Sequence, residues 1–144
     1  MRGLEGALVD LDVLTLTALQ ADDVRALEAK VAGPAGLMVA KLHKIEERNG
    51  TARANDKDAL DVLRLLRGVF TEELAQRMTR ILADGRSADS AQRGLELLDA
   101  LFGRGGEGAE MAARAVAGVM DADEILPSCE VLSGDLLSAL EAGE

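Results

Sequence analysis

The chain has 144 residues, is 48% hydrophobic and carries a formal net charge of −10, with an isoelectric point near 4.6. This length and apolar content suffice for one domain with a buried core, and they exclude a disordered tail. The acidic charge and the two Phe residues, without Trp or Tyr, exclude an extensive nucleic-acid surface built on phosphate contacts or base stacking.

The cellular compartment is indicated by cysteine usage and by the apolar runs. The single cysteine, Cys129, leaves no internal disulfide, which is typical of a reducing cytoplasm, and we interpret it as a buried thiol. The apolar runs are far shorter than the ~20 residues of a membrane span. The N-terminus lacks the basic-then-apolar pattern of a signal peptide. We therefore expect a cytoplasmic protein with no membrane contact.

Residues 7–19, ALVDLDVLTLTAL, are rich in Val and Thr and partly alternate, which predicts a β-strand. After the QADD turn, residues 25–31, RALEAKV, alternate as a second strand, so the sequence predicts a β-hairpin. An alternative interpretation makes residues 22–32 helical, since Ala, Leu, Glu and Lys all favour helix.

From Pro34 onwards the apolar periodicity is helical, and Gly33-Pro34 is well suited to begin the first helix. That helix is predicted to end at Arg48, a loop to cover residues 50–56, and a second helix to run from residue 57 to about Gly68. The buried stripe of the first helix is predicted at Met38, Leu42 and Ile45, and that of the second at Ala59, Val62, Leu63 and Leu66. Pro127 is expected to break the chain, and the segment 103–108, GRGGEG, to be a flexible joint. Further helices are predicted at residues 71–83, 88–102, 111–120 and 134–142.

The predicted fold is α+β and mostly helical, with a hairpin region at residues 1–33 and a helical domain at residues 34–144. A two-stranded hairpin is marginally stable by itself, and its edges are open. We therefore expect either that helices cover the hairpin or that it pairs with strands from outside this chain, in a second copy or in another protein.

The densest group of chemically active side chains lies between residues 41 and 61. Lys41, Lys44 and Arg48 share one stripe of the first helix, and the second helix opens with Lys57, Asp58 and Asp61. Together they could grip a phosphate and handle a proton or a metal. In the plainer interpretation, the long basic side chains cover the margin of the core with their charges in water, and the acidic residues stabilise the N-terminus of the second helix. The spacing alone favours this interpretation.

Three other residues are candidate members of a site. Asp10 and Asp12 point the same way from the predicted strand, as a metal pair would, but a solvated strand face gives the same spacing and is favoured. His43 is the only histidine, too few for a zinc site, and is expected to face solvent or a neighbouring group.

The segment KLHKIEERNGTARANDKDALDVLRLL resembles the third motif of the AbiEii-type nucleotidyltransferases, which include the MenT-like toxins of toxin–antitoxin and phage-defence pairs. Lys41-Leu42 matches the start of the motif and Arg48 its middle Arg. Lys57-Asp58 stands in place of its Arg-Asp, and Asp61-Val62 in place of its Asp-Leu. The gap between Arg48 and Lys57 is longer than in the family, and the similarity covers roughly residues 5–68.

The resemblance implies a partial polymerase-β-like fold in which magnesium aligns a nucleoside triphosphate. It makes Lys41 the phosphate contact and Asp58 the catalytic carboxylate, supported by Arg48, Lys57 and Asp61. The family's first motif, Gly-Ser followed by Asp-x-Asp, is missing because no Gly-Ser pair occurs. The metal ligands are therefore unknown, and magnesium is expected only if a complete site exists.

Two functional hypotheses follow. In the first, the chain is the C-terminal portion of a nucleotidyltransferase of the toxin–antitoxin or phage-defence type, truncated and inactive by itself. In the second, it is a non-catalytic acidic helical module that assembles through its hairpin with a second copy or a partner chain.

Overall fold

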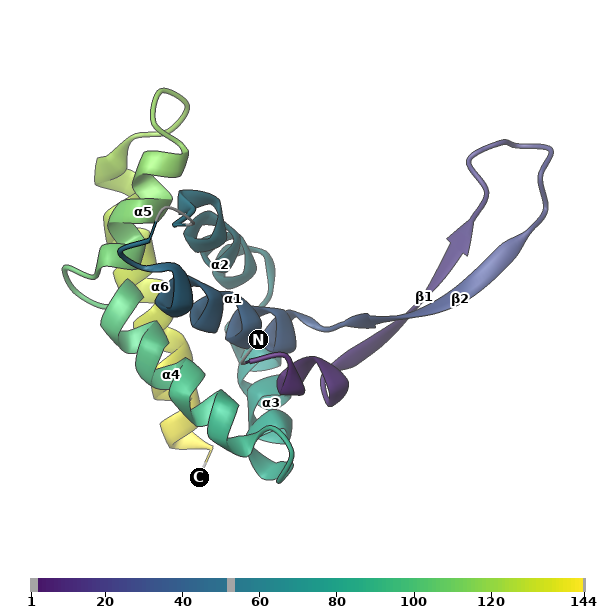
Figure 1. The fold of residues 1–144 in the computed structure, drawn as a ribbon, viewed down its shortest axis with the longest axis horizontal. Coiled ribbons are helices and arrows are strands. Elements are labelled where there is room, and N and C mark those ends of the chain that lie inside the picture. Colours follow the sequence, from purple (N-terminus) through teal and green to yellow (C-terminus); the bar gives the residue numbers. More distant parts are fainter. Residues whose placement is uncertain (1–2, 52–53, 144) are drawn as a thin grey trace.

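The computed structural model describes residues 3–51 and 54–143, and they form a helical body from which a long β-hairpin projects (Figure 1). The strands β1 (Leu11–Thr17) and β2 (Ala26–Ala32) are antiparallel, with a register that runs from Leu11 opposite Ala32 to Thr17 opposite Ala26. The predicted hairpin is confirmed, and the helical alternative for residues 22–32 is wrong. The chain is α+β and mostly helical, as predicted.

The first strand is shorter than predicted, because residues 7–10 are not extended. A short 3-10 helix, η1 (Glu5–Leu8), precedes it and packs against the first α-helix. The chain enters β1 only after Asp10, whose backbone carbonyl accepts a hydrogen bond from Gly33 N–H at 2.7 Å. This bond closes the base of the hairpin.

The body contains η1 and, within the described residues, six α-helices. They are α1 (Pro34–Arg48), α2 (Asp56–Gly68), α3 (Thr71–Ala83), α4 (Ala88–Phe102), α5 (Glu107–Ala115) and α6 (Ala122–Ala142). In the described part of the chain, none of these helices is both long and apolar enough to cross a membrane.

The core is aliphatic, because each helix turns a period-3.6 apolar stripe inwards. The predicted stripes of α1 and α2 are confirmed. The largest side chains that are fully buried include Met38, Leu42, Leu63, Leu74, Met78, Leu98, Phe102, Ile125 and Leu136. The hairpin contributes none of them, so the body holds together through its helices alone.

The predicted boundaries of α5 are wrong. This helix spans Glu107–Ala115 rather than residues 111–120, and residues 116–119 form turns. Gly108 belongs to the helix and not to a flexible joint. A Cβ at Gly108 would lie 2.9 Å from the ring of Phe102, so the glycine allows α5 to approach the end of α4 closely.

The predicted break at Pro127 is also wrong, because α6 runs through it. Ile125 and Cys129, on either side of the proline, are fully buried, and their packing keeps the helix continuous. Asp123, whose carbonyl loses its N–H partner at Pro127, is exposed and can be hydrated. Ser133 does not cap a separate helix; its hydroxyl donates to the carbonyl of Phe102 at 3.2 Å.

Replacing Pro127 by Ala should stabilise the protein by about 1–3 kcal/mol, because alanine restores a helical hydrogen bond and removes the clash of the proline ring. Part of the gain is offset by the greater freedom of the unfolded chain. Urea unfolding followed by circular dichroism measures the change. A variant less stable than the parent would contradict this account of α6.

Candidate functional site

Five of the six residues singled out between positions 41 and 61 meet where α1 faces α2. Lys41, Lys44 and Arg48 lie along one stripe of α1 and face Asp58 and Asp61 of α2. We call these five residues the ion cluster. The side chain of Asn55 accepts a hydrogen bond from Lys57 N–H at 3.0 Å, which caps α2 and places Asp58 in its first turn.

Asp58 is the centre of the ion cluster, and its side chain is only 4% exposed. Its Oδ1 atom accepts hydrogen bonds from Lys41 Nζ at 2.9 Å and from Lys44 Nζ at 2.8 Å. Its Oδ2 atom accepts a longer bond of 3.4 Å from an Arg48 guanidinium nitrogen. Both carboxylate oxygens are therefore occupied by cations from α1.

Asp61 lies at the outer side of the ion cluster. Its carboxylate accepts from Lys41 Nζ at 2.8 Å and from Arg64 at 3.2 Å, and its side chain is 25% exposed. Lys41 thus bridges the two carboxylates. Lys57, which the resemblance placed beside them, is exposed and lies outside the ion cluster.

The pKa values within the ion cluster follow from two opposing effects. Burial alone would raise the pKa of Asp58, but the hydrogen bonds from Lys44 and Lys41 outweigh it and hold that pKa below its ordinary value. Burial alone would lower the pKa of Lys41, and its bonds to Asp61 and Asp58 raise it instead. Both pKa shifts favour the charged form, so Asp58 and Lys41 do not resemble groups that are tuned for proton transfer near neutral pH.

The ion cluster does not fit magnesium. A magnesium site needs oxygen ligands that are free to face the metal, whereas three cations already surround Asp58. Across residues 3–51 and 54–143, no group of three or more His, Cys, Asp or Glu side chains is arranged to hold a metal ion.

A second buried carboxylate, Asp10, joins the hairpin to the body. It accepts hydrogen bonds from the N–H groups of Ala35 and Gly36 at 2.9 and 3.0 Å, and so satisfies the N-terminus of α1. It also binds Arg77 of α3 at 2.9 Å, and the same guanidinium reaches Asp12 at 3.0 Å. We call Asp10, Asp12 and Arg77 the anchor.

The anchor corrects the interpretation of Asp10 and Asp12 as a solvated strand face. Asp10 is 2% exposed and lies before β1, and both carboxylates turn towards Arg77. Arg77 is more than sixty positions away in the sequence, so spacing within the strand could not reveal it. The two acids are structural ion-pair partners and not a metal pair.

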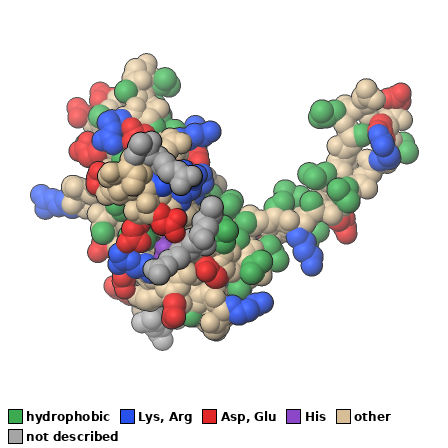
Figure 2. Space-filling view, viewed as in Figure 1, with side chains coloured by type: hydrophobic (Ala, Val, Ile, Leu, Met, Phe, Trp, Pro, Cys, Tyr) green, Lys and Arg blue, Asp and Glu red, His purple; other side chains and the backbone are tan. Residues whose placement is uncertain are grey.

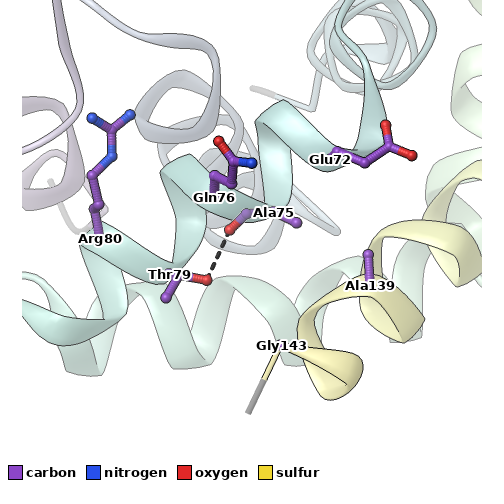
Figure 3. Close-up of a pocket in the computed structure, with 7 residues that line it drawn as sticks. All are labelled: Glu72, Ala75, Gln76, Thr79, Arg80, Ala139 and Gly143. Carbon is purple, nitrogen blue, oxygen red and sulfur yellow. Dashed lines mark hydrogen bonds between the residues drawn. The ribbon is translucent and has the colours of Figure 1, made fainter.

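A cavity of about 650 Å³ between α3 and the end of α6 does not gather reactive groups, and Figure 3 shows Glu72 and Arg80 at its opposite ends. The hydroxyl of Thr79 is already bonded to the carbonyl of Ala75 at 2.9 Å. A smaller cavity of about 280 Å³ borders the ion cluster at Lys41 and Asp61.

The two remaining reactive side chains are buried. Cys129 is fully buried, as predicted, and burial raises the pKa of its thiol to about 11, so it is not a nucleophile at neutral pH. His43 faces a neighbouring group, as one of the two predicted options had it. Its Nε2 lies 2.9 Å from the carbonyl of Ser90 and donates to it, since a carbonyl only accepts.

The hairpin is the most unusual surface of the molecule. We call residues 11–32 the arm. Apolar side chains follow it away from the body (Figure 2), and Leu14, Leu16 and Leu27 are 48%, 51% and 65% exposed. From the register, these three share one side of the arm with Ala29 and Val31, and we call these five residues the apolar face.

The open edges of the hairpin are predicted from the sequence, whereas the exposure of the apolar face is not. The alternation of residues 11–17 and 26–32 contains part of the signal, because Leu14, Leu16 and Leu27 fall on the same side of the paired strands. Leu11 and Val13 lie on the opposite side, where they are also exposed. In an ordinary domain such a face would pack on the core. Only the structure shows that the body leaves it uncovered.

Comparisons of this chain with protein-family models, with curated proteins and with solved structures find no match.

Replacing Asp58 by Ala should destabilise the fold by about 3 kcal/mol, because three cations would lose the buried carboxylate that they share. Asp61→Ala is the matched control, since it also removes a partner of Lys41 but from a more exposed position, and should cost only about 1 kcal/mol. Urea unfolding measures both. Equal losses would show that the burial of Asp58 does not set the stability of the ion cluster.

Proposed function

We propose that this protein is a non-catalytic assembly module that binds another protein chain through its arm. The observation that carries the proposal is the exposure of Leu14, Leu16 and Leu27 on a hairpin that projects from the body. A contiguous apolar surface of this kind is unfavourable in water and typically marks an interaction site.

The open edges of the arm support the same function. Each strand of a two-stranded sheet presents a row of backbone N–H and C=O groups to solvent, and a further strand can pair with them. Natural edge strands are usually short, whereas β1 and β2 have seven residues each.

The body supports this function by holding the arm in place. Asp10 binds the start of α1 and Arg77 of α3, so that the base of the arm is tied to two helices. A fixed base reduces the entropy that is lost when the arm meets its partner. The ion cluster has a structural role in this proposal, because its charges are paired with one another.

We expect a photo-crosslinking amino acid at Leu27, on the exposed side of β2, to form covalent adducts with another protein chain in the cells that naturally make the protein. The same group at Asp135, exposed on α6, is the control and should give few adducts. Denaturing electrophoresis and mass spectrometry detect and identify the adducts. Equal, low yields at both positions would contradict the proposal.

A second candidate function is nucleotidyl transfer of the toxin–antitoxin or phage-defence type, favoured by one observation. Lys41 Nζ and Asp58 Oδ1, the two groups that the AbiEii-type resemblance places at the reacting centre, lie 2.9 Å apart. The cavity of about 280 Å³ beside Lys41 approaches the lower limit of small-molecule sites. In this function the nucleoside triphosphate would meet Lys41, with Arg48, Lys57 and Asp61 in support.

The proposal places both functions in the cytoplasm. The single cysteine supports this, because a lone buried thiol needs no oxidising compartment.

We expect no incorporation of labelled ATP, CTP, GTP or UTP by this chain alone with magnesium, since the carboxylate of Asp58 is held by three cations. Lys41→Ala and Asp58→Ala variants serve as controls for contaminating activity. Incorporation that is lost in both variants would contradict this prediction and would favour the second candidate function.

A further inference from the structure

We propose that the partner of the arm is a second copy of this chain, and that the two β2 strands pair antiparallel about a two-fold axis at Ala29. This inference rests on the proposed assembly function and names its partner. The geometry that points to it is the arrangement of charges and free backbone groups along the outer edge of β2.

The hydrogen bonds at the two ends of the hairpin show which backbone groups are free. Gly33 N–H donates to Asp10 at 2.7 Å, and Ala18 N–H donates to Arg25 at 3.3 Å. In an antiparallel sheet, residue pairs that exchange backbone hydrogen bonds alternate with pairs that do not. The N–H and C=O groups of the odd-numbered residues of β2 are therefore bonded to β1. The N–H and C=O groups of Ala26, Glu28, Lys30 and Ala32 therefore point outwards.

The side chains of β2 are complementary to themselves. In the sequence ALEAKVA, residues at equal distances from Ala29 are alike in size, and Glu28 and Lys30 are opposite in charge. When Ala29 lies opposite Ala29 of a second copy, Glu28 faces Lys30 and Lys30 faces Glu28. Both are exposed, and oppositely charged cross-strand pairs stabilise a sheet.

The backbone and the side chains select the same register. In this arrangement the outward-facing residues meet one another, so each pair of Glu28 and Lys30 can exchange two backbone hydrogen bonds. A slip of two residues in either direction would place Glu28 opposite Glu28 or Lys30 opposite Lys30, and like charges destabilise a sheet. The charges therefore favour this register over the two registers that are slipped by two residues.

The outer edge of β1 lacks this property. Its outward-facing residues, by the same alternation, are Leu11, Val13, Thr15 and Thr17, and none is charged. Pairing through β1 would have no charge pair to fix its register. This difference favours β2 as the edge through which two copies meet.

Pairing of the β2 strands would convert two exposed hairpins into one four-stranded antiparallel sheet. A two-fold axis perpendicular to the sheet keeps both apolar faces on the same side, where Leu27 of one copy lies beside Val31 of the other. The contact of Leu27 with Val31 across the seam lowers the exposure of these two side chains. Four strands also reach the size at which sheets become independently stable.

A charge-swap series on the full-length protein tests the inference, with self-association measured by analytical ultracentrifugation from micromolar to millimolar concentration. Glu28→Lys alone and Lys30→Glu alone each create two like-charge pairs and should weaken dimerisation by about tenfold or more. The double variant E28K/K30E restores opposite charges and should dimerise as the parent does. An equimolar mixture of the two single variants should form a heterodimer.

The outcomes separate this inference from the assembly function. A parent protein that stays monomeric, or single variants that dimerise as well as the parent, would overturn the inference. Adducts at Leu27 with a different protein, and none with a second copy, would overturn it while the assembly function stands. No adducts at all would contradict both. Circular dichroism confirms that each variant keeps its helical content.

A disulfide trap locates the symmetry axis independently. Ala29→Cys should form an intermolecular disulfide on oxidation, because a non-bonded antiparallel pair brings the two Cα atoms to about 4.5 Å, within disulfide range. Ala26→Cys is the control, since Ala26 faces Ala32 of the other copy, and it should form few disulfides. The native Cys129 is buried and does not compete. Equal trapping of the two variants would contradict the register.

Discussion

The carboxylate of Asp10 is the constraint on which the arrangement of this molecule depends. It is buried, it satisfies two N–H groups at the start of α1, and it binds Arg77 of α3. A buried charge is tolerated only when it is paired and hydrogen-bonded in this way. Gly33 is required beside it, because a Cβ there would lie 2.4 Å from a carboxylate oxygen. The projection of the arm therefore follows from one well-satisfied acid at its base.

The body and the arm differ in where their charged and apolar side chains lie. In the body, the charges of Lys41, Lys44 and Arg48 are directed inwards at Asp58, where they stabilise the contact of α1 with α2. On the arm, Leu14, Leu16 and Leu27 remain in water. The charges of the ion cluster thus find their partners within the chain, whereas the apolar face has no side chains of the body packed over it. This contrast is the reason that the arm, rather than the ion cluster, supports the assignment of function.

Much of the fold could be predicted, because local patterns and the final packing agree. The alternation in the two strands predicted the hairpin, and the stripes of α1 and α2 predicted their buried faces. The predictions failed at positions where contacts between residues far apart in the sequence determine the local structure. Pro127 was expected to end a helix, but the burial of Ile125 and Cys129 carries α6 through it. The convergence of Lys41 with Asp58 was predicted from the single connection that joins the first two helices. The burial of Asp10 was not, since it requires Arg77 from a remote helix.

The sequence by itself determined the elements of this protein: an aliphatic helical chain, a β-hairpin before Pro34, and a pair of helices whose charges lie close in sequence. Short-range periodicity and helix caps encode these features, so they can be inferred without coordinates. Only the tertiary structure decided that the arm stands clear of the body and that Asp58 and Asp10 are buried within cationic surroundings. Exposure depends on which helices pack over a residue, and that is a property of the whole chain rather than of its neighbours in sequence.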